Sequence, residues 1–409
     1  MHQQPEKSDI GVALVDDDPV MLKFIGRMLF KLGFPNVTLF DNGRAALSSM
    51  TSPAAPPQLI LCDLNMPEMD GIEFIRELVA IGYTGHLILI SGEDERVLQT
   101  AETLVRAHRI AILGHLRKPV DQSALAALLA DWSPTVSART RAAPVVCDPD
   151  ALRAAIANGE LVNHYQPKVH VASGRVVGVE ALVRWQPPQT GLVFPDQFIG
   201  IAEKHGLIDD LTRVVVTTAL GQLRRWNDAG LPLRVAINVS MDNLNSLDFA
   251  DFVAAAAAAA GVAPQNIVLE VTESRLMEDL RAPLEILTRL RLKRFRLSID
   301  DFGTGHSSFS QLRDIPFDEL KIDRGFVHGA GANPTVRAIY DASLGLARDL
   351  GMDIVAEGVE DLDDWQLLRD TGCDFAQGYF IAKPMAAADL PRWMAAWPAR
   401  LAELLATTQ

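Results

Sequence analysis

The chain has 409 residues, of which 48% are hydrophobic and 22% are charged, and this composition is typical of a globular protein rather than a disordered one. At about 100 to 200 residues per domain, the length predicts two or three domains. The 52 acidic and 38 basic side chains give a formal net charge of −14. This charge disfavours DNA binding, because the phosphates of nucleic acid are also negative.

The sequence indicates neither a membrane span nor a secretory signal. The longest apolar stretch, residues 252–263, is mostly alanine and is shorter than the ~18 residues that a membrane span requires. The first nine residues are polar and lack the apolar core of a signal peptide. Cys62, Cys147 and Cys373 are widely spaced, which argues against disulfides and a structural zinc site. We therefore expect a cytoplasmic protein without membrane insertion.

Strand and helix patterns alternate over residues 9–132. Ile10–Val15 is a short apolar run that ends at three aspartates, and apolar residues then follow at helical spacing from Met21 to Leu32. Alternation of this kind predicts a parallel sheet, here a doubly wound α/β domain of five strand–helix units. The other segments that we single out are the strands Val37–Phe40, Gln58–Cys62, His86–Ile90 and Ile110–Leu116, and the helices Ile72–Ala80 and Ser123–Trp132.

Residues 133–149 carry Pro, Ser, Thr, Ala and Arg without periodicity, and we interpret them as an interdomain linker. The second domain, residues 150–400, opens with two strand patterns separated by Ala172-Ser173-Gly174, which predicts an antiparallel hairpin. Eight strand–helix units predict a (β/α)8 barrel with one antiparallel strand. The expected strands are Val162–Val171, Arg175–Val183, Arg234–Val239, Ile267–Val271, Arg296–Asp300, Glu319–Ile322, Asp353–Ala356 and Phe375–Gly378, and the expected helices are Leu211–Ala229, Phe249–Ala260, Pro283–Leu292, Thr335–Leu350 and Asp361–Thr371.

Carboxylates follow two of the strands expected in the first domain. Asp16 and Asp17 come after the first strand and Asp63 after the third, where open α/β sheets place their ligand sites. Three converging carboxylates repel one another unless a cation lies among them, so we expect a Mg²⁺ site. Ser91 closes the fourth strand and Lys118 follows the fifth, which adds a hydroxyl and a cation. Such a set suits a transferable phosphoryl group.

The first domain resembles the receiver domain of two-component response regulators over about Ile10–Trp132. Each motif alone also fits the turns of an inert α/β domain, but four motifs in the right order favour the receiver. They are Val15-Asp16-Asp17-Asp18-Pro19, Asp63-Leu64-Asn65-Met66-Pro67-Glu68-Met69-Asp70-Gly71, Ser91-Gly92 and Lys118-Pro119.

The resemblance implies a flavodoxin-like fold in which Asp63 is the phosphoacceptor. It also implies that a histidine kinase or a phosphotransfer protein is the partner. His115 stands where the family usually has an aromatic residue, so transmission through that side chain should differ from the family pattern. The Mg²⁺ and phosphoryl site would be formed by Asp16, Asp17, Asp63, the carbonyl of Asn65, Ser91 and Lys118.

Polar residues interrupt seven consecutive strands of the expected barrel. Any one of them could be a solvated residue at the rim, but together they should gather at the carboxyl ends of the strands. So many carboxylates at one mouth require divalent cations, and the absence of paired His or Cys favours Mg²⁺ or Mn²⁺ over zinc. Two adjacent aspartates could let two ions share a carboxylate. The residues are Glu180, Asn238, Glu270, Asp300 with Asp301, Lys321, Glu357 and Gln377.

The second domain resembles the EAL domain of bacterial cyclic di-GMP phosphodiesterases over about Ala151–Ala395. The departures from the family pattern are His306, where a Tyr is usual, and Ala382, where a Ser is common. The matching motifs are Tyr165-Gln166-Pro167, Glu180-Ala181-Leu182-Val183-Arg184-Trp185, Ile237-Asn238-Val239-Ser240, Leu269-Glu270-Val271-Thr272-Glu273, Ile299-Asp300-Asp301-Phe302-Gly303-Thr304-Gly305, Leu320-Lys321-Ile322-Asp323, Ala356-Glu357-Gly358-Val359-Glu360 and Ala376-Gln377-Gly378-Tyr379-Phe380.

The EAL resemblance implies two-metal hydrolysis of cyclic di-GMP to linear pGpG, with Lys321 orienting the attacking water and Glu357 and Gln377 assisting. Which group accepts the proton stays open. Gln166 and Arg184 would hold the substrate, and Glu273 would fix the loop that carries Asp301. One metal would be held by Glu180, Asn238, Glu270 and Asp300, and the other by Asp300, Asp301 and Glu357.

Two alternatives to this enzyme follow from the family. Some EAL domains have lost acidic residues and act only as cyclic di-GMP sensors, but no ligand position is missing in this sequence. An enzyme that also synthesises the messenger would need a Gly-Gly-Asp-Glu-Phe type segment, which the sequence lacks. We therefore favour a phosphodiesterase whose activity is modulated by phosphorylation of Asp63. The resemblance also implies a homodimer or a higher homo-oligomer.

Overall fold

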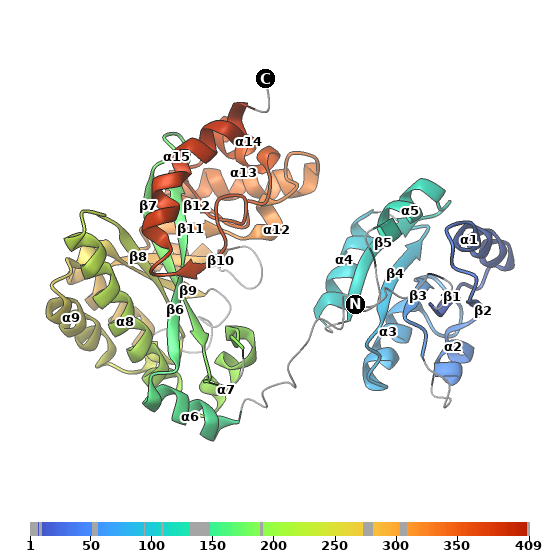
Figure 1. The fold of residues 1–409 in the computed structure, drawn as a ribbon, viewed down its shortest axis with the longest axis horizontal. Coiled ribbons are helices and arrows are strands. Elements are labelled where there is room, and N and C mark those ends of the chain that lie inside the picture. The colour runs from blue at the N-terminus through green and yellow to red at the C-terminus, as the bar shows by residue number, and fades with distance from the viewer. Residues whose placement is uncertain are drawn as a thin grey trace. The chain divides into compact units, whose positions relative to one another are not determined.

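The computed structural model describes residues 7, 10–50, 56–93, 95–107, 110–130, 132, 148–188, 191–272, 281–302 and 309–406. The chain divides into two compact units, with the division between residues 143 and 144. Figure 1 draws both units in the colours of the sequence. Within the described residues, no helix is both long enough and apolar enough to cross a membrane.

The first unit is a five-stranded parallel sheet of order β2-β1-β3-β4-β5. Alternate residues of β1 enter the two cores: Leu14 packs with α1 and α5 on one face, and Val15 packs with α2, α3 and α4 on the other. The doubly wound fold expected from the sequence is therefore confirmed. Its elements are β1 (Val12–Val15), α1 (Pro19–Lys31), β2 (Val37–Phe40), α2 (Gly43–Met50), β3 (Leu59–Asp63), α3 (Gly71–Ala80), β4 (His86–Ser91), α4 (Glu95–Ala107), β5 (Ala111–Arg117) and α5 (Gln122–Ala130).

The second unit is a closed barrel. Its strands follow one another in chain order, and the last one pairs with the first, which closes the sheet. All neighbouring pairs are parallel except those of β6, which runs antiparallel to β7 and to β13. The expected (β/α)8 barrel with one antiparallel strand is confirmed. The strands are β6 (Leu161–His170), β7 (Val176–Trp185), β8 (Arg234–Val239), β9 (Ile267–Thr272), β10 (Arg296–Phe302), β11 (Glu319–Ile322), β12 (Asp353–Ala356) and β13 (Phe375–Ala376).

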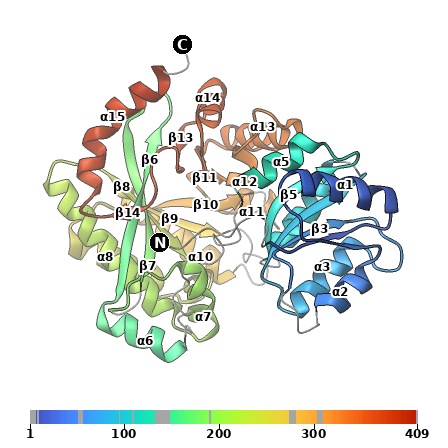
Figure 2. The ribbon, with the colours of Figure 1, turned by 45° about the vertical axis from the view of Figure 1, so that its right-hand side comes forward.

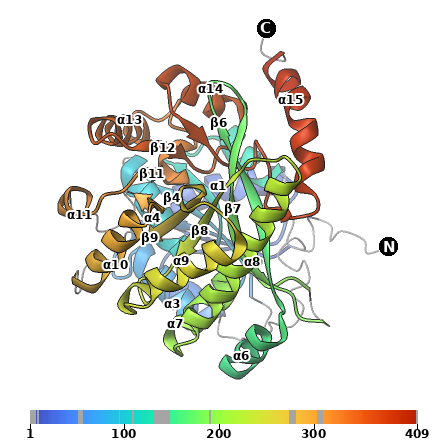
Figure 3. The same ribbon diagram turned by 90° about the vertical axis from the view of Figure 1, so that its left-hand side faces the viewer.

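Helices surround the barrel, and the long strands β6 and β7 lie side by side as a hairpin (Figure 2). Figure 3 shows α8, α9 and α10 on the outer side of the strands that they connect. A further short strand, β14 (Met385–Ala386), pairs antiparallel with β6 near its start. The helices are α6 (Pro149–Asn158), α7 (Ile199–Lys204), α8 (Ile208–Asp228), α9 (Phe249–Ala260), α10 (Arg281–Leu292), α11 (Phe309–Asp314), α12 (Arg324–Val327), α13 (Pro334–Asp349), α14 (Leu362–Thr371) and α15 (Leu390–Ala406).

Candidate catalytic and phosphoacceptor sites

The carboxyl ends of β1, β3 and β5 bring two buried aspartates to one lysine. The Nζ atom of Lys118 lies 2.8 Å from Oδ2 of Asp16 and 2.8 Å from Oδ2 of Asp63. Burial raises the pKa of Asp63 above its ordinary value, although the hydrogen bond from Lys118 partly offsets this effect. Burial alone would lower the pKa of Lys118, but Asp16 and Asp63 raise it above its ordinary value. Lys118 therefore provides the countercharge for both aspartates.

The remaining residues expected at this edge lie close to the same pair of aspartates. Carboxylate oxygens of Asp16, Asp17 and Asp63 all lie within 4.8 Å of one another, which is compact enough for one cation. The backbone N–H of Asn65 donates to Oδ1 of Asp63 at 3.3 Å. Ser91 is fully buried at the end of β4, and its carbonyl accepts from the N–H of Lys118 at 2.8 Å. The donor set suits Mg²⁺.

The centre of the barrel mouth is the ammonium group of Lys321, on β11. This side chain is 1% exposed and is surrounded by carboxylates from four other strands or strand ends. Its Nζ atom lies 2.7 Å from Glu357, 3.0 Å from Asp300, 3.1 Å from Glu270 and 3.9 Å from Glu180. The structure therefore gathers five of the polar residues that interrupt the strand patterns into one buried cluster.

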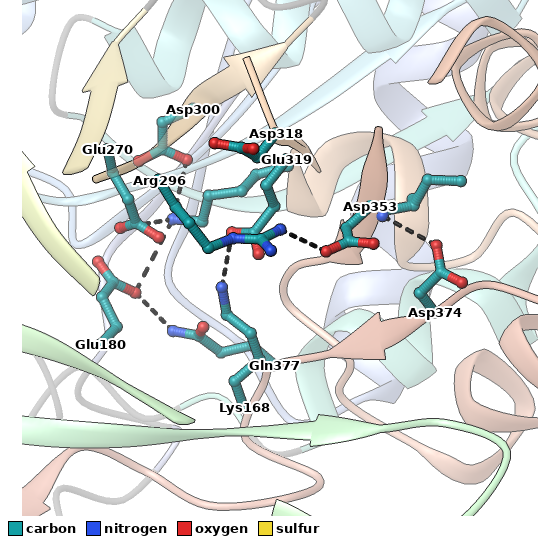
Figure 4. A network of polar contacts seen from close by, with 12 residues as sticks. Lys168, Glu180, Glu270, Arg296, Asp300, Asp318, Glu319, Asp353, Asp374 and Gln377 are labelled. Atoms are coloured by element: carbon teal, nitrogen blue, oxygen red, sulfur yellow. Dashed lines mark hydrogen bonds and ion pairs between the residues drawn. The ribbon is translucent and has the colours of Figure 1, made fainter. Parts of the chain in front are cut away.

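Amide side chains connect this cluster to β6. Nε2 of Gln377 donates to Oε2 of Glu180 at 2.5 Å and to Oε1 of Gln166 at 3.0 Å, as Figure 4 shows for the first of these bonds. Nδ2 of Asn238 donates to Oε1 of Glu180 at 2.7 Å. The backbone oxygen of Ala382 accepts from Gln166. Both oxygens of Glu180 are thus fixed, and their direction is determined by side chains from β8 and from the end of β13.

Burial and the shared lysine set the protonation of the catalytic carboxyls in the metal-free protein. Burial raises the pKa of Glu357 to about 8, against the opposing attraction of Lys321. Burial also raises the pKa of Glu270 well above its ordinary value. Burial disfavours the charged form of Glu180 too, but Lys321, Gln377 and Asn238 lower its pKa overall. Despite its own burial, the pKa of Lys321 is raised by the surrounding carboxylates.

The arrangement fits a centre that binds divalent cations. Glu270 is fully buried, and neither of its carboxylate oxygens accepts a hydrogen bond within the described part of the chain. A buried carboxylate without hydrogen bonds is costly unless a cation compensates it. Four carboxylates share the one ammonium group of Lys321, so the cluster remains acidic. Oxygen ligands of this kind are those that Mg²⁺ and Mn²⁺ prefer.

A cavity of about 250 Å³ opens above this cluster. Gln166 lines it together with three residues that the sequence analysis did not assign to the site: Arg324, Glu360 and Tyr379. Arg324 donates to Glu360 at 2.6 Å. The positions of Arg324 and Glu360 in the chain were a usable signal, because Arg324 lies three residues after Lys321 and Glu360 lies three residues after Glu357.

Three of the residues that we expected at the site are not among those that the structure shows at the cluster or the cavity. Glu273 and the side chain of Asp301 lie outside the described residues. Arg184 is buried but is not among the residues that line the cavity, and its guanidinium carbon lies 5.1 Å from the ring centre of Phe194. Glu180 lies in the middle of β7 rather than at its end, because β7 continues past it in the hairpin with β6.

Comparison with known proteins shows the family to which this chain belongs. Residues 150–384 match the EAL domain, and residues 12–130 match the response regulator receiver domain. The chain belongs to the EAL domain family and carries a receiver domain. It is 31% identical over 381 residues to the cyclic di-GMP phosphodiesterase RocR of Pseudomonas aeruginosa, an alignment that covers 92% of this chain and 97% of RocR.

Other relatives match the EAL domain alone. The bifunctional diguanylate cyclase/cyclic di-GMP phosphodiesterase MucR of Pseudomonas aeruginosa is 42% identical over 240 residues, which is 58% of this chain but only 35% of MucR. The solved structure of the PaMucR phosphodiesterase in complex with c-di-GMP is also 42% identical and has a TM-score of 0.56, covering 59% of this chain and 98% of that one. The alignment with RocR, in contrast, extends over both domains of this chain.

Proposed function

We propose that this receiver–EAL protein hydrolyses cyclic di-GMP to linear pGpG with two divalent cations, Mg²⁺ or Mn²⁺. The observation that carries the proposal is the convergence of four carboxylates on Lys321 beneath an open cavity. Two similarities support the substrate: RocR is a cyclic di-GMP phosphodiesterase, and the PaMucR structure is a c-di-GMP complex. The phosphodiester of the substrate is negative, like the carboxylates of this mouth, and could approach them only with cations present.

The metals would be held by the carboxylates that now surround Lys321, with the amide of Asn238 added. When bound, the two cations would neutralise the charge of the phosphodiester and acidify the attacking water. Asp300 would be shared between them, because it is followed directly by a second aspartate in the sequence. One ion would be held by Glu180, Asn238, Glu270 and Asp300, and the other by Asp300, Asp301 and Glu357.

The protein's own side chains position the water and the nucleotide. Lys321 would orient the water by donating to it, while Glu357 and Gln377 would hold the water and Lys321 in place. The water oxygen forms the new bond to phosphorus, the bond from phosphorus to the 3′ oxygen breaks, and that oxygen leaves with a proton. Gln166, which lines the cavity, and Arg184 would hold the substrate. The product keeps a 5′ phosphate.

Phosphorylation of Asp63 by a histidine kinase or a phosphotransfer protein would control the reaction. The support for this part is the receiver site itself, where Lys118 already contacts both aspartates and the end of β4. A phosphoryl group on Asp63 would add roughly two negative charges at neutral pH and would compete for that lysine. The ion pair with Lys118 would then have to rearrange.

The assay that tests the activity compares two glutamates of the EAL domain. Glu180→Gln removes one charge from the metal ligands and should lower the turnover of cyclic di-GMP at least 100-fold, since loss of even an indirect ligand contact costs about 10- to 100-fold. Glu160→Gln is the control, because Glu160 accepts from Trp185 Nε1 and does not line the cavity. Product formation is followed by chromatography with Mg²⁺, with Mn²⁺ and with EDTA. Tight binding without hydrolysis in the wild type would identify a sensor instead of an enzyme.

A further inference from the structure

Asp364, at the start of α14, is a buried carboxylate with an unusually complete set of partners. Only 3% of this residue is exposed. Its Oδ2 atom accepts from Nδ1 of His328 at 2.9 Å and from the N–H of Glu360 at 3.0 Å, and its Oδ1 atom accepts from the N–H of Gly329 at 3.2 Å. These three donors belong to two separate loops, so the carboxylate ties the loops together.

The two loops are those that follow the strand of Lys321 and the strand of Glu357. His328 caps the C-terminus of α12, which begins two residues after β11, and Gly329 follows it. Glu360 lies in the connection between β12 and α14. The carboxylate of Glu360 in turn accepts from Arg324, at 2.6 Å. We call Arg324 and Glu360 the rim pair, because both line the cavity.

The close approach of Gly358 to Arg324 couples the two loops at the rim pair. Gly358 has a left-handed φ of 61°, and a side chain there would collide with that of Arg324. The position of Arg324 therefore depends on the path of the loop after β12. Asp364 determines that path, because it is bonded to the backbone of Glu360 and to the end of α12.

The charges around Asp364 point to protonated His328 as its countercharge. Oxygens of Glu360 and Asp361 lie 3.9 Å from ring nitrogens of His328, in addition to the bond from Asp364. The hydrogen bond to Asp364 and the nearby carboxylates raise the pKa of His328 above its ordinary value of 6.5. Oxygen and nitrogen atoms of His328, Asp361 and Asp364 are close enough to hold a metal ion. The imidazolium already supplies a positive charge there, and both oxygens of Asp364 already accept hydrogen bonds.

We propose that Asp364 and His328 are positioning residues for the nucleotide: they hold the rim pair in place and thereby set the affinity for the substrate. This inference rests on the proposed function, since it assumes that the cavity binds cyclic di-GMP. Neither residue lines the cavity, so both act through Glu360 and Arg324. Within the described part of the chain, neither Asp364 nor His328 forms a hydrogen bond or an ion pair with Lys321 or Glu357.

The first experiment compares two aspartates, Asp364 and Asp374, whose carboxylates both accept hydrogen bonds from backbone N–H groups. Asp364→Asn loses the charge and places an N–H₂ group against one of three donors. KM for cyclic di-GMP should rise by about threefold to tenfold, the effect of one ordinary hydrogen bond, because the change reaches the nucleotide only through the rim pair. The kcat value should stay within about twofold, because the reacting groups are untouched. Asp374→Asn is the control, since Asp374 accepts from the N–H of Ile354 at the opposite end of β12 (Figure 4). An equal KM in both variants would overturn the proposal.

The second experiment measures KM at different pH values, and it tests the positioning role even if Asp364→Asn folds poorly. His328→Asn removes the imidazolium, so its KM should exceed that of the wild type about threefold or more near pH 6. The ratio of the variant's KM to the wild-type KM should fall toward one near pH 9, because the wild type loses the same charge as pH rises through the raised pKa of His328. His170→Asn is the control, because His170 contacts the hydroxyl of Ser173. A ratio that is independent of pH, or equal to that of the control, contradicts the proposal.

A binding measurement separates this inference from the proposed function. The dissociation constant for cyclic di-GMP is measured by calorimetry with Ca²⁺ in place of Mg²⁺ or Mn²⁺, because Ca²⁺ supplies positive charge to the mouth but coordinates less rigidly than the proposed reaction requires. If the wild type binds without ever hydrolysing, the phosphodiesterase assignment fails, yet weaker binding by Asp364→Asn still supports the positioning role. If Asp364→Asn binds as tightly as the wild type, the positioning role fails while the activity assignment stands. Absence of binding to the wild type overturns both.

Discussion

The carboxylates around Lys321 carry more negative charge than one ammonium group can compensate, and bound cations would supply the rest. The ammonium group contacts Glu270, Asp300 and Glu357 within 3.1 Å, and Glu180 is slightly farther away. Burial, together with repulsion from the neighbouring carboxylates, raises the pKa of Glu357 and that of Glu270, and the one positive charge of Lys321 offsets only part of this effect. The site is therefore protonated in part until metal enters.

This protonation predicts how metal and pH act together on stability. The folded-state pKa of Glu357 is about 8, above its ordinary value of 4.5. A carboxyl with a raised folded pKa contributes stability below its unfolded pKa and loses that contribution as pH rises through its folded pKa. The metal-free protein should thus lose stability between about pH 4.5 and pH 8, whereas Mn²⁺ compensates the ionised form.

Thermal unfolding with Mn²⁺ and with EDTA, between about pH 6 and 8.5, measures this effect across the raised pKa of Glu357. We expect the Tm difference between the two conditions to widen with pH. The Glu180→Gln variant is the control, because it weakens the metal site and should narrow the difference throughout. A Tm difference that stays constant as pH rises would show that Glu357 and Glu270 are already ionised in the metal-free protein, which contradicts the prediction.

At the residue scale, the sequence predicted the buried cluster around Lys321 better than it predicted the residues that line the cavity above it. Polar residues such as Glu270 and Lys321 interrupt apolar strands, so they are visible in a single sequence. Asp364 looks like an ordinary acid in the first turn of a helix, where it is expected to face water. Two of its partners, the imidazole of His328 and the N–H of Gly329, lie 36 and 35 positions earlier in the chain, and a contact between such distant segments leaves no periodic signal.

At the element scale, strand β6 carries a second buried charge into the barrel. Nζ of Lys168 lies 2.7 Å from Oε1 of Glu319 on β11, and both side chains are almost fully buried (Figure 4). Burial disfavours ionisation of Glu319, but Lys168 lowers its pKa overall. The register of β6 with β7 places Lys168 two residues from Gln166, below the catalytic cluster. This ion pair is therefore a structural component of the barrel interior.

A double-mutant cycle tests that interpretation. Lys168→Met leaves the carboxylate of Glu319 buried without its partner and should lower the free energy of unfolding by about 3 to 5 kcal/mol. The double variant with Glu319→Leu should recover most of that loss, because an apolar pair of similar volume avoids the cost of burying two charges. Urea unfolding provides the measurement. A double variant that is as unstable as Lys168→Met would mean that the pair itself contributes a large net stabilisation.

Element boundaries show where sequence patterns stop being informative. The predicted range of β8, Arg234–Val239, agrees with the structure, as do those of β11 and β12. Strand β13 was expected to extend to Gly378 but ends at Ala376, where Gln377 turns inward to bond Glu180. Strand β14 was missed, because two residues are too few for any alternation to be seen. The short helices α2 and α7 were missed for a similar reason.

At the scale of the whole molecule, the receiver should regulate the EAL domain through Asp63. Beryllofluoride occupies a phosphoacceptor without covalent transfer, so adding it should change the phosphodiesterase rate of the wild type. Asp63→Asn should keep the basal rate and lose the response. Asp70→Asn is the control, because Asp70 lies in the same loop but accepts from Glu73 as the N-cap of α3. Rates are measured between about pH 6 and 8, where a histidine titrates.

The pH range is chosen because of His115, whose Nδ1 atom lies 2.8 Å from Oε2 of Glu102 on α4. This pair takes the place of the aromatic side chain that receivers usually have, and a change in its charge would alter how β5 and α4 pack. Identical rates at every pH, with Asp63 shown by mass spectrometry to be phosphorylated, would mean that the receiver acts through localisation or partner binding. The homodimer implied by the family stays a prediction.

The antiparallel strand β6 also determines when the EAL domain can be completed during synthesis. Its partners on one side are β13 and β14, and Gln166 bonds a residue 211 positions later in the chain. At about 5 to 20 residues per second, the ribosome needs roughly 10 to 40 s to produce that second half of the contact. During this interval one edge of the first hairpin has no partner strand, and an unpaired strand edge is a site at which a nascent chain can pair with other chains.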